Sequence, residues 1–208
     1  MEREGIINII LLSGETGVGR TSIIYGIENR VFQEEYKPTV GLDSYIIERI
    51  FERRKFKMIL NFIEYSSEEN IYQSIPEDFI IDSYIFLLVF SNIENLNKLK
   101  DRWYSFYKQY ANIDNSTFIL IGNKSDTFGD KREKIIKQGE IFADDINALF
   151  LTCSAKHYDN IDSIEGFIMS QTRRFINEKL KLEENERFNL QEEIKINKKN
   201  KGSKCILF

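Results

Sequence analysis

A glycine-rich segment near the N-terminus has the composition and spacing of a phosphate-binding loop. It lies between a short apolar run, residues 6–12, and a stretch that favours a helix from Thr21 onward. In a turn at this position, successive backbone N–H groups can point at a polyphosphate. The segment reads G-x-x-x-x-G-R-T, and the candidate phosphate-binding residues are Gly14, Glu15, Thr16, Gly17, Val18, Gly19, Arg20, Thr21 and Ser22.

One position of this loop departs from the Walker A pattern. That pattern has Lys where Arg20 stands, because a compact ammonium fits beside the β- and γ-phosphates while the next hydroxyl, here that of Thr21, binds Mg²⁺. Arginine keeps the charge, but its guanidinium is longer and forked. We therefore expect this group either above the phosphates or pointing outward. The alternative interpretation of the segment is an ordinary glycine-rich turn.

Two further loops, each following a predicted buried strand, contain candidate base-binding residues. The strand over residues 118–121 runs into a loop with the motif N-K-x-D, and the strand over 150–153 runs into a loop that reads S-A-K. Together with the phosphate loop, and in this order, the two motifs resemble those of the Ras superfamily of small GTPases. The resemblance covers about residues 5–180, and also the tail.

This resemblance implies a guanine site. In it, the Asp126 carboxylate accepts hydrogen bonds from the guanine N1–H and exocyclic amine, and the Ala155 backbone N–H donates to O6. Adenine presents the opposite edge. Asn123 is expected to tie the loops together, and two lysine stems are expected to lie over the base. The candidate base-site residues are Asn123, Lys124, Asp126, Ser154, Ala155 and Lys156.

Residues 32–41 resemble the switch I segment of the same family. By this resemblance, Phe32 packs edge-on against the base, and Thr39 completes Mg²⁺ coordination and contacts the γ-phosphate. The implied cofactors are GTP or GDP and Mg²⁺, with Thr21 and Thr39 as the metal ligands. The alternative for Phe32 is a core residue that ends the first helix.

The motifs indicate the subfamily less specifically than they indicate the superfamily. Residues 14–17 and 39–43 look more like Rab proteins than Ras or Rho proteins, and only 27 residues separate Asp126 from Ser154, so the extra helix of Rho proteins is absent. Most Rab proteins end in two cysteines, whereas this chain has one near its end. This difference leaves the branch of the superfamily open.

The segment that should contain switch II breaks the family pattern. The family begins this segment with D-x-x-G-Q, whereas residues 62–69 contain neither glycine nor glutamine. The family glycine contacts the γ-phosphate, and the glutamine positions the attacking water. Aligning Glu64 with the family Asp puts Glu68 in the glutamine position, and aligning Tyr65 with it puts Glu69 there. Either register places a carboxylate near the phosphates, so we expect impaired hydrolysis and assign no catalytic residue.

Strands and helices alternate along the chain, which indicates a mostly parallel sheet covered by helices. The expected fold is a three-layer α/β domain of the Ras type, with a mostly parallel six-stranded sheet and one antiparallel edge strand. Strands are predicted over 6–12, 43–51, 55–64, 84–90, 117–121 and 150–153, the second and third as a hairpin. Helices are predicted from 21 and over 95–110, 133–147 and 161 to about 187.

Length and composition exclude several classes of protein. The 208 residues and 24.6 kDa fit one G domain over residues 1–182 and a helix end with a flexible tail over 183–208. Two Cys and one His exclude a disulfide-stapled fold and a Cys/His zinc module, and favour a reducing compartment. We expect a monomer.

Charge is divided unevenly along the chain. Five of the 29 basic residues lie in residues 195–208, which contain no acid. The first 194 residues keep 24 basic against 33 acidic residues and carry a net charge of −9. An acidic body argues against nucleic-acid binding, and a basic end favours an anionic surface.

The last four residues form a C-a-a-X box. Phe208 in the final position favours geranylgeranylation of Cys205, and the neighbouring lysines add attraction to an anionic leaflet. We expect a lipid anchor on the cytoplasmic face of a membrane, with a cytosolic pool. The alternative is a solvated basic tail.

The leading functional hypothesis is a membrane-anchored, Rab-like GTP/GDP switch that is read by effector and regulatory proteins. Vesicle trafficking is implied by the resemblance alone. The alternative is a non-cycling pseudo-GTPase scaffold that recruits partners at a membrane. An adenine-using P-loop enzyme is a third hypothesis, which the N-K-x-D loop disfavours.

Overall fold

A computed structural model of the chain describes residues 3–29, 31–35, 37–51, 56–66, 75, 77–81, 83–112 and 115–178. The chain forms two compact units, Met1–Met169 and Ser170–Phe208. In the second unit, residues 170–178 are helical, and Arg174 pairs with Glu178 one turn later at 3.0 Å. The predicted end of the last helix near residue 187, the tail over 183–208 and Cys205 lie outside the described residues.

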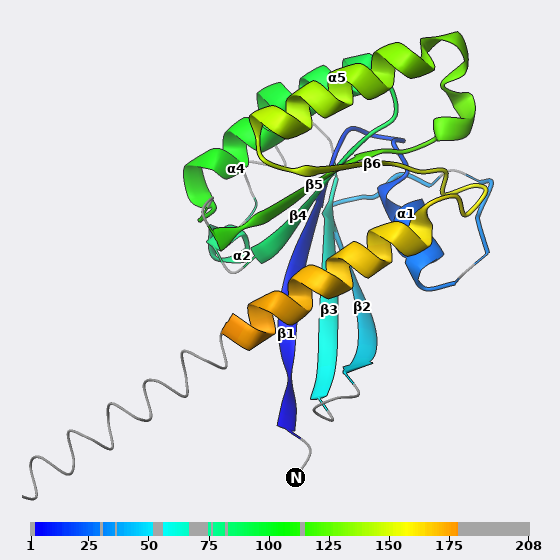
Figure 1. Cartoon of the computed structure of the whole chain (residues 1–208). Coiled ribbons are helices and arrows are strands. Elements are labelled where there is room, and N and C mark those ends of the chain that lie inside the picture. The colour runs from blue at the N-terminus through cyan, green and yellow to red at the C-terminus, as the bar shows by residue number, and fades with distance from the viewer. Residues whose placement is uncertain are drawn as a thin grey trace, which may run out of the picture. The chain divides into compact units, whose positions relative to one another are not determined.

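The first unit contains a six-stranded sheet with the order β2-β3-β1-β4-β5-β6 (Figure 1). β2 and β3 are antiparallel neighbours, paired from Leu42 with Tyr65 to Phe51 with Phe56, and the other neighbouring strands are parallel. This arrangement confirms the predicted fold class, including the antiparallel edge strand. The strands are β1 (Arg3–Ser13), β2 (Leu42–Phe51), β3 (Phe56–Tyr65), β4 (Ser83–Phe90), β5 (Thr117–Gly122) and β6 (Leu149–Thr152).

The helices agree with the predicted pattern apart from two features. The segment expected as one helix over 95–110 is helical from 93 to 110, but its middle part, Leu99–Tyr104, is a π-helix. The five-residue α2 was not predicted, because so short an element has no periodicity to recognise. The helices are α1 (Arg20–Ile27), α2 (Glu77–Ile81), α3 (Ile93–Lys98), α4 (Ser105–Tyr110) and α5 (Arg132–Asp145), and a further helix begins at residue 161.

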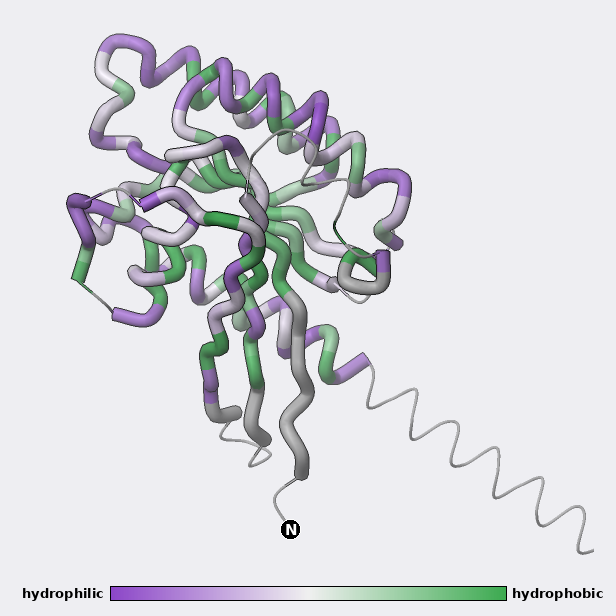
Figure 2. Tube along the Cα trace, turned by 180° about the vertical axis from the view of Figure 1, so that it is seen from behind, coloured by the Kyte–Doolittle hydropathy of each residue, from purple (hydrophilic) through white to green (hydrophobic). Residues whose placement is uncertain are grey.

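Apolar side chains are buried on both faces of the sheet, because helices cover both faces. Every residue of β4 is buried, and Phe86, Leu88 and Phe90 share one cluster with Trp103 and Tyr107 from the helical segment after β4. Figure 1 shows α4 and α5 on one side of the sheet and α1 on the other. In Figure 2, hydrophobic residues (green) are concentrated in the middle of the sheet, and the helices contain many hydrophilic residues (purple). Burial on both faces explains why these strands are nearly continuous apolar runs.

The topology determines where a site can form. The carboxyl ends of parallel strands meet at one edge of a sheet, and ligands bind there in open α/β folds. β1 ends at Ser13 and runs into the phosphate loop, β5 runs into the loop that begins at Asn123, and β6 runs toward Ser154. The predicted motifs are therefore brought together by the sheet and not by their distances in the sequence.

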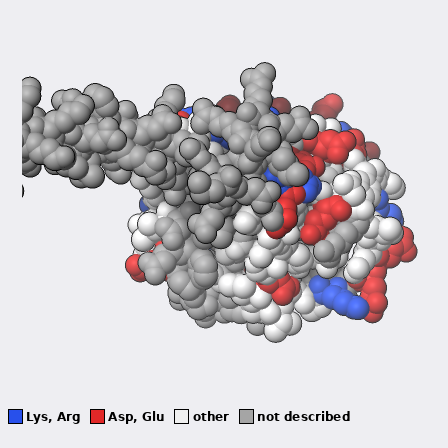
Figure 3. All heavy atoms as spheres, turned by 90° about the horizontal axis from the view of Figure 1, so that it is seen from below, with Lys and Arg blue, Asp and Glu red and all other residues white. Residues whose placement is uncertain are grey.

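The surface agrees with the acidic character expected for the body of the chain. Among the described residues on the face shown in Figure 3, Asp and Glu side chains form several groups and Lys and Arg are fewer. Within the part of the chain that the structure describes, no helix is both long and apolar enough to span a bilayer.

Candidate functional site

The phosphate loop, the two base-site loops and the segment before β2 surround one pocket of about 700 Å³. Phe32 lines this pocket and is absent from the buried core, so its position agrees with the switch I assignment and not with the core alternative. The lining contains these predicted site residues: Thr16, Gly17, Gly19, Arg20, Thr21, Ser22, Phe32, Thr39, Asn123, Lys124, Asp126, Ala155 and Lys156.

The remaining predicted residues lie behind the lining and support it. Gly14 has φ +152°, and a Cβ there would come within 2.2 Å of the Val89 carbonyl oxygen, so only glycine lets the loop pass this close to β4. Glu15 pairs with Arg102 at 3.2 Å. Val18 is buried. These contacts fix the loop against β4 and the π-helical segment.

Asn123 joins the phosphate loop to both base-site loops. Its side chain is buried, and its Nδ2 donates to the Val18 carbonyl oxygen at 2.8 Å. Its Oδ1 accepts from the Ala155 backbone N–H at 3.1 Å. Gly19 is required beside it, because a Cβ there would come within 2.4 Å of Nδ2. One amide side chain therefore sets the spacing between the phosphate and base regions.

Asp126 is held as a carboxylate at the base end of the pocket. The Ser154 hydroxyl donates to its Oδ1 at 2.6 Å, and this hydrogen bond is the main reason why the pKa of Asp126 lies below its ordinary value of 3.8. Its Oδ2 lies 3.9 Å from His157 Nε2. Because an ionised carboxylate has four acceptor positions, Asp126 keeps the capacity to accept N–H groups from a ligand.

The lysines of the base-site loops lie at the rim. Lys124 adopts a left-handed conformation with φ +61°, which turns the chain into the short 3₁₀ turn Ser125–Thr127. Lys156 Nζ lies 3.7 Å from Glu34 Oε1, an exposed contact between the third loop and the segment after α1. Surface pairs of this kind contribute little to stability.

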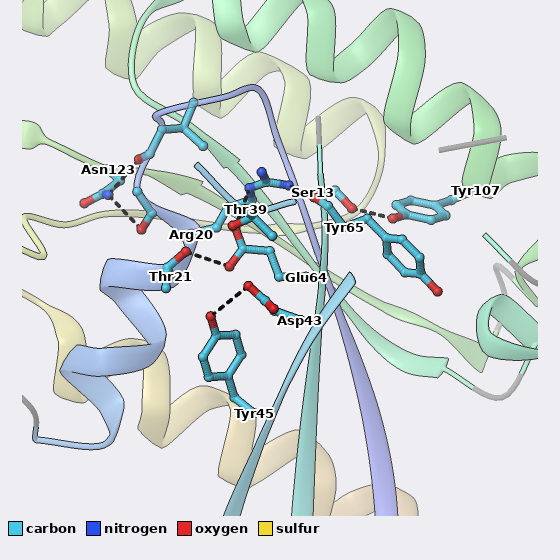
Figure 4. A network of polar contacts seen from close by, with 12 residues as sticks. Ser13, Arg20, Thr21, Thr39, Asp43, Tyr45, Glu64, Tyr65, Tyr107 and Asn123 are labelled. Carbon is cyan, nitrogen blue, oxygen red and sulfur yellow. Dashed lines mark hydrogen bonds and ion pairs between the residues drawn. The ribbon is translucent and has the colours of Figure 1, made fainter. Parts of the chain in front are cut away.

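The Arg20 guanidinium does not point outward, which was one of the two positions expected for it, and Arg20 is among the residues that line the pocket. It turns inward, is only 5% exposed, and donates from Nη1 to the Tyr65 carbonyl oxygen at 2.5 Å. Its Nε lies 3.3 Å from Glu64 Oε1, and Glu64 is only 2% exposed (Figure 4). The buried Glu64 carboxylate supplies the opposite charge and the Tyr65 carbonyl supplies an acceptor, which a buried guanidinium requires.

Glu64 is also the acceptor for two hydroxyl groups. Thr21 Oγ1 donates to Glu64 Oε2 at 2.8 Å, and Thr39 Oγ1 donates to Oε1 at 3.0 Å (Figure 4). Glu64 is the next-to-last residue of β3 and was absent from the predicted site residues. The broken switch II pattern pointed to its segment, but no local signal distinguished it from Tyr65.

Comparison with known proteins gives the family. A family model described as the Ras family matches residues 9–174, which is most of the chain. The chain belongs to the Ras family of small GTPases. Members of this family bind guanine nucleotide, generally with Mg²⁺.

This GTPase is similar to Rab proteins at low sequence identity. The chain is 27% identical over 166 residues to "Ras-related protein RabC" of Dictyostelium discoideum, covering 79% of this chain and 82% of that protein. It is 27% identical over 155 residues to "GTP-binding protein ypt1" of Schizosaccharomyces pombe and 28% identical over 155 residues to "Ras-related protein RABD2a" of Arabidopsis thaliana. Each of these two matches covers 74% of this chain and 73% of the relative.

The contacts of Glu64 favour one of the two possible switch II registers. In this GTPase, Glu64 lies against the phosphate loop, whereas the Tyr65 side chain is buried away from it and its hydroxyl has no hydrogen-bond partner among the described residues. These contacts favour the alignment of Glu64 with the family Asp (Figure 4). That register assigns Glu68 to the glutamine position. Glu68 and Glu69 lie outside the described residues.

Asp43 and Tyr45 also line the pocket, and sequence reasoning missed both. Tyr45 donates to Asp43 Oδ2 at 3.5 Å and packs edge-on against Tyr25 at a centroid distance of 6.0 Å. Burial, followed by the charge of Glu64, raises the pKa of Tyr45 above its ordinary value, so its hydroxyl stays protonated. Asp43 ends the Rab-like segment 39–43 but was given no role in the site, and only the pairing of β2 with β3 brings it beside Glu64.

Proposed function

We propose that this small GTPase binds GDP and GTP in the pocket described above and acts as a Rab-like switch in vesicle trafficking. One observation supports the proposal above all others. The ionised Asp126 carboxylate and the Ala155 backbone lie on loops that Asn123 ties to the phosphate loop. Guanine offers N–H donors to the carboxylate and O6 to the Ala155 N–H, whereas adenine offers the opposite groups.

The test is calorimetric titration of the purified full chain, stripped of nucleotide, with GDP and ADP in the presence of Mg²⁺. We expect saturable binding of GDP, and affinity for ADP lower by at least about 100-fold, because ADP leaves the buried polar groups of the base site unpaired. Equal affinities for the two nucleotides would contradict a guanine site.

Magnesium fits the oxygen donors at the other end of the pocket. Thr21 and Thr39 offer hydroxyl oxygens and Glu64 offers a carboxylate, which are ligands that Mg²⁺ prefers. When bound, the metal would neutralise charge on the phosphates. Among the described residues, no group of three or more His, Cys, Asp or Glu could hold a metal. The nucleotide phosphates would therefore have to supply further ligands.

Hydrolysis of GTP is expected to be slow. Arg20 pairs with Glu64 and donates to the Tyr65 carbonyl, so the positive charge that should neutralise the phosphates is already balanced within the protein. The position of the water-orienting glutamine falls on Glu68 in the register given by Glu64. Because phosphoryl transfer depends on positioning and charge neutralisation, both changes act against the reaction.

A second candidate function is a scaffold that recruits partners at a membrane without cycling between nucleotides, and the inward position of Arg20 favours it. Single-turnover hydrolysis of γ-labelled GTP separates the two functions. For a switch we expect cleavage at or below about 10⁻⁴ s⁻¹ that is abolished by Thr21→Ala. Bound GTP that stays intact over many hours would support the scaffold.

Membrane attachment is proposed to depend on the C-terminal cysteine. Cys205→Ser removes the only thiol of the C-a-a-X box, so we expect the protein to leave the membrane pellet in cell fractionation, because the tail lysines alone give only reversible attraction. The matched control is Cys153→Ser, which changes a buried cysteine distant from the tail in sequence. Unchanged membrane association of Cys205→Ser would refute the lipid anchor.

A further inference from the structure

The contacts of Glu64 connect three separate segments through one carboxylate. Thr21 comes from the first turn of α1, Thr39 from the segment before β2, and Glu64 from the end of β3. Both hydroxyls donate to this carboxylate, at 2.8 Å and 3.0 Å, and its charge is balanced by Arg20. We call these four residues, Arg20, Thr21, Thr39 and Glu64, the Glu64 clamp.

We propose that the Glu64 clamp holds the segment that contains switch I, in its described residues 31–35 and 37–41, closed over the phosphate loop with the protein's own atoms. This proposal deepens the proposed function and rests on it, because switch I is the segment through which nucleotide state would be read. In the family, Thr39 is the residue that Mg²⁺ and the γ-phosphate hold. In this chain, a fixed carboxylate provides the same attachment.

The formal charges of the Glu64 clamp balance without an added ion. Glu64 contributes one negative charge and Arg20 one positive charge, and each side chain is at least 95% buried. The carboxylate accepts two hydroxyl groups and the guanidinium donates to the Tyr65 carbonyl, so both charged groups are hydrogen-bonded. A buried charge pair persists when its polar atoms are satisfied in this way. Within the Glu64 clamp, the two opposite charges therefore balance each other without a bound ion.

Apolar packing does little to hold the same segment. Val31 is 84% exposed and Val40 is 78% exposed, so neither side chain fixes the segment to the core. A backbone hydrogen bond from Ser66 N–H to the Gly41 carbonyl at 2.8 Å holds its end against β3. The hydrogen bond of Thr39 to the clamp is thus the main side-chain attachment of the segment near Val40. Its loss should release the segment without unfolding the core.

The proposal predicts that closure of switch I is independent of Mg²⁺ and of the γ-phosphate. Spin labels on Val40→Cys and Ile141→Cys, both exposed positions, would report the distance between switch I and α5 by pulsed electron resonance. The full chain with Cys205→Ser is used, and Cys153 stays unlabelled because it is fully buried. After removal of nucleotide and Mg²⁺ with EDTA, we expect one narrow distance distribution that Mg²⁺ with a non-hydrolysable GTP analogue leaves unchanged.

Two variants test the role of the clamp. Thr39→Val keeps the volume of the side chain but removes one hydroxyl, and it leaves the Arg20 and Glu64 pair intact. Glu64→Gln removes the charge that holds Arg20. Both are expected to lose the narrow distribution, while Glu94→Gln, which changes an exposed side chain of α3, keeps it. Because Thr39 is half-buried and outside the core, this variant remains informative if Glu64→Gln fails to fold.

The outcomes separate this proposal from the nucleotide site on which it rests. A broad distribution in the stripped protein that narrows only with Mg²⁺ and the GTP analogue would overturn the clamp and leave nucleotide binding intact. A narrow distribution in Thr39→Val would also overturn it. A narrow distance distribution in the stripped protein that is lost in Thr39→Val supports the clamp. This conclusion holds even if calorimetry detects no binding of GDP. In that case the proposed function fails and the clamp stands.

Discussion

Replacing Glu64 with alanine is expected to lower the free energy of unfolding by about 3–5 kcal/mol. The variant leaves the Arg20 guanidinium buried without its counter-charge, and it removes the acceptor of the Thr21 and Thr39 hydroxyls. Breaking one side of a buried pair is costly because the remaining charge has lost its hydration and gains nothing in return. Urea denaturation of the full chain, followed by circular dichroism, measures the change.

A double variant distinguishes the effect of an unpaired buried charge from a simple loss of packing. Arg20→Met combined with Glu64→Leu replaces both charges with apolar side chains, and we expect it to recover most of the stability lost in Glu64→Ala. The control is Glu94→Ala, which breaks an exposed pair with Lys98 one helical turn away and should cause no measurable change. A double variant no more stable than Glu64→Ala would contradict the electrostatic explanation.

The second large effect is expected for Asp126→Asn in the base site. The change replaces a charged acceptor of two guanine N–H groups by an amide, so the two hydrogen bonds, each worth about 1.5–3 kcal/mol, are lost or reversed. We expect the affinity for GDP to fall by about 10²–10⁴-fold in calorimetric titration. The fold should be kept, because Asp126 lies at the pocket rim and not in the core.

Two comparisons make this result specific. Asp130→Asn changes an exposed carboxylate in the next 3₁₀ turn and should leave the affinity for GDP unchanged. Inosine diphosphate lacks the exocyclic amine, so the wild type should bind it more weakly than GDP, whereas Asp126→Asn should no longer prefer GDP. A variant that binds GDP as tightly as the wild type would mean that Asp126 does not contact the base.

The two ends of the pocket differ in how closely their residues follow the motifs of the Ras family. At the base end, Asn123 contacts both the phosphate loop and Ala155, and the Ser154 hydroxyl donates to Asp126. At the phosphate end, Arg20 and Glu64 both line the pocket and pair with each other. We infer that nucleotide identity is recognised more strongly than nucleotide state, because recognition of the base and of the γ-phosphate uses separate groups.

The amino-acid sequence by itself determined the fold class, the place of the phosphate loop and the two base-site loops. Buried strands must be continuous apolar runs when both faces of a sheet are covered, and loops at strand ends must supply particular backbone geometries. These are local requirements, and each leaves a local pattern such as the apolar run before Gly14 or the N-K-x-D motif after β5. The α2 helix escaped prediction because five residues are too short for such a pattern.

Only the tertiary structure decided the direction of Arg20 and brought Glu64 against the phosphate loop. Arg20 meets the Tyr65 carbonyl 45 positions later in the chain, and Thr21 meets Glu64 43 positions later. A long side chain has several rotamers of similar energy, and its choice among them depends on which charges the fold brings near it. No local periodicity contains this information, because the partner arrives only when β3 pairs with β1 beside the phosphate loop.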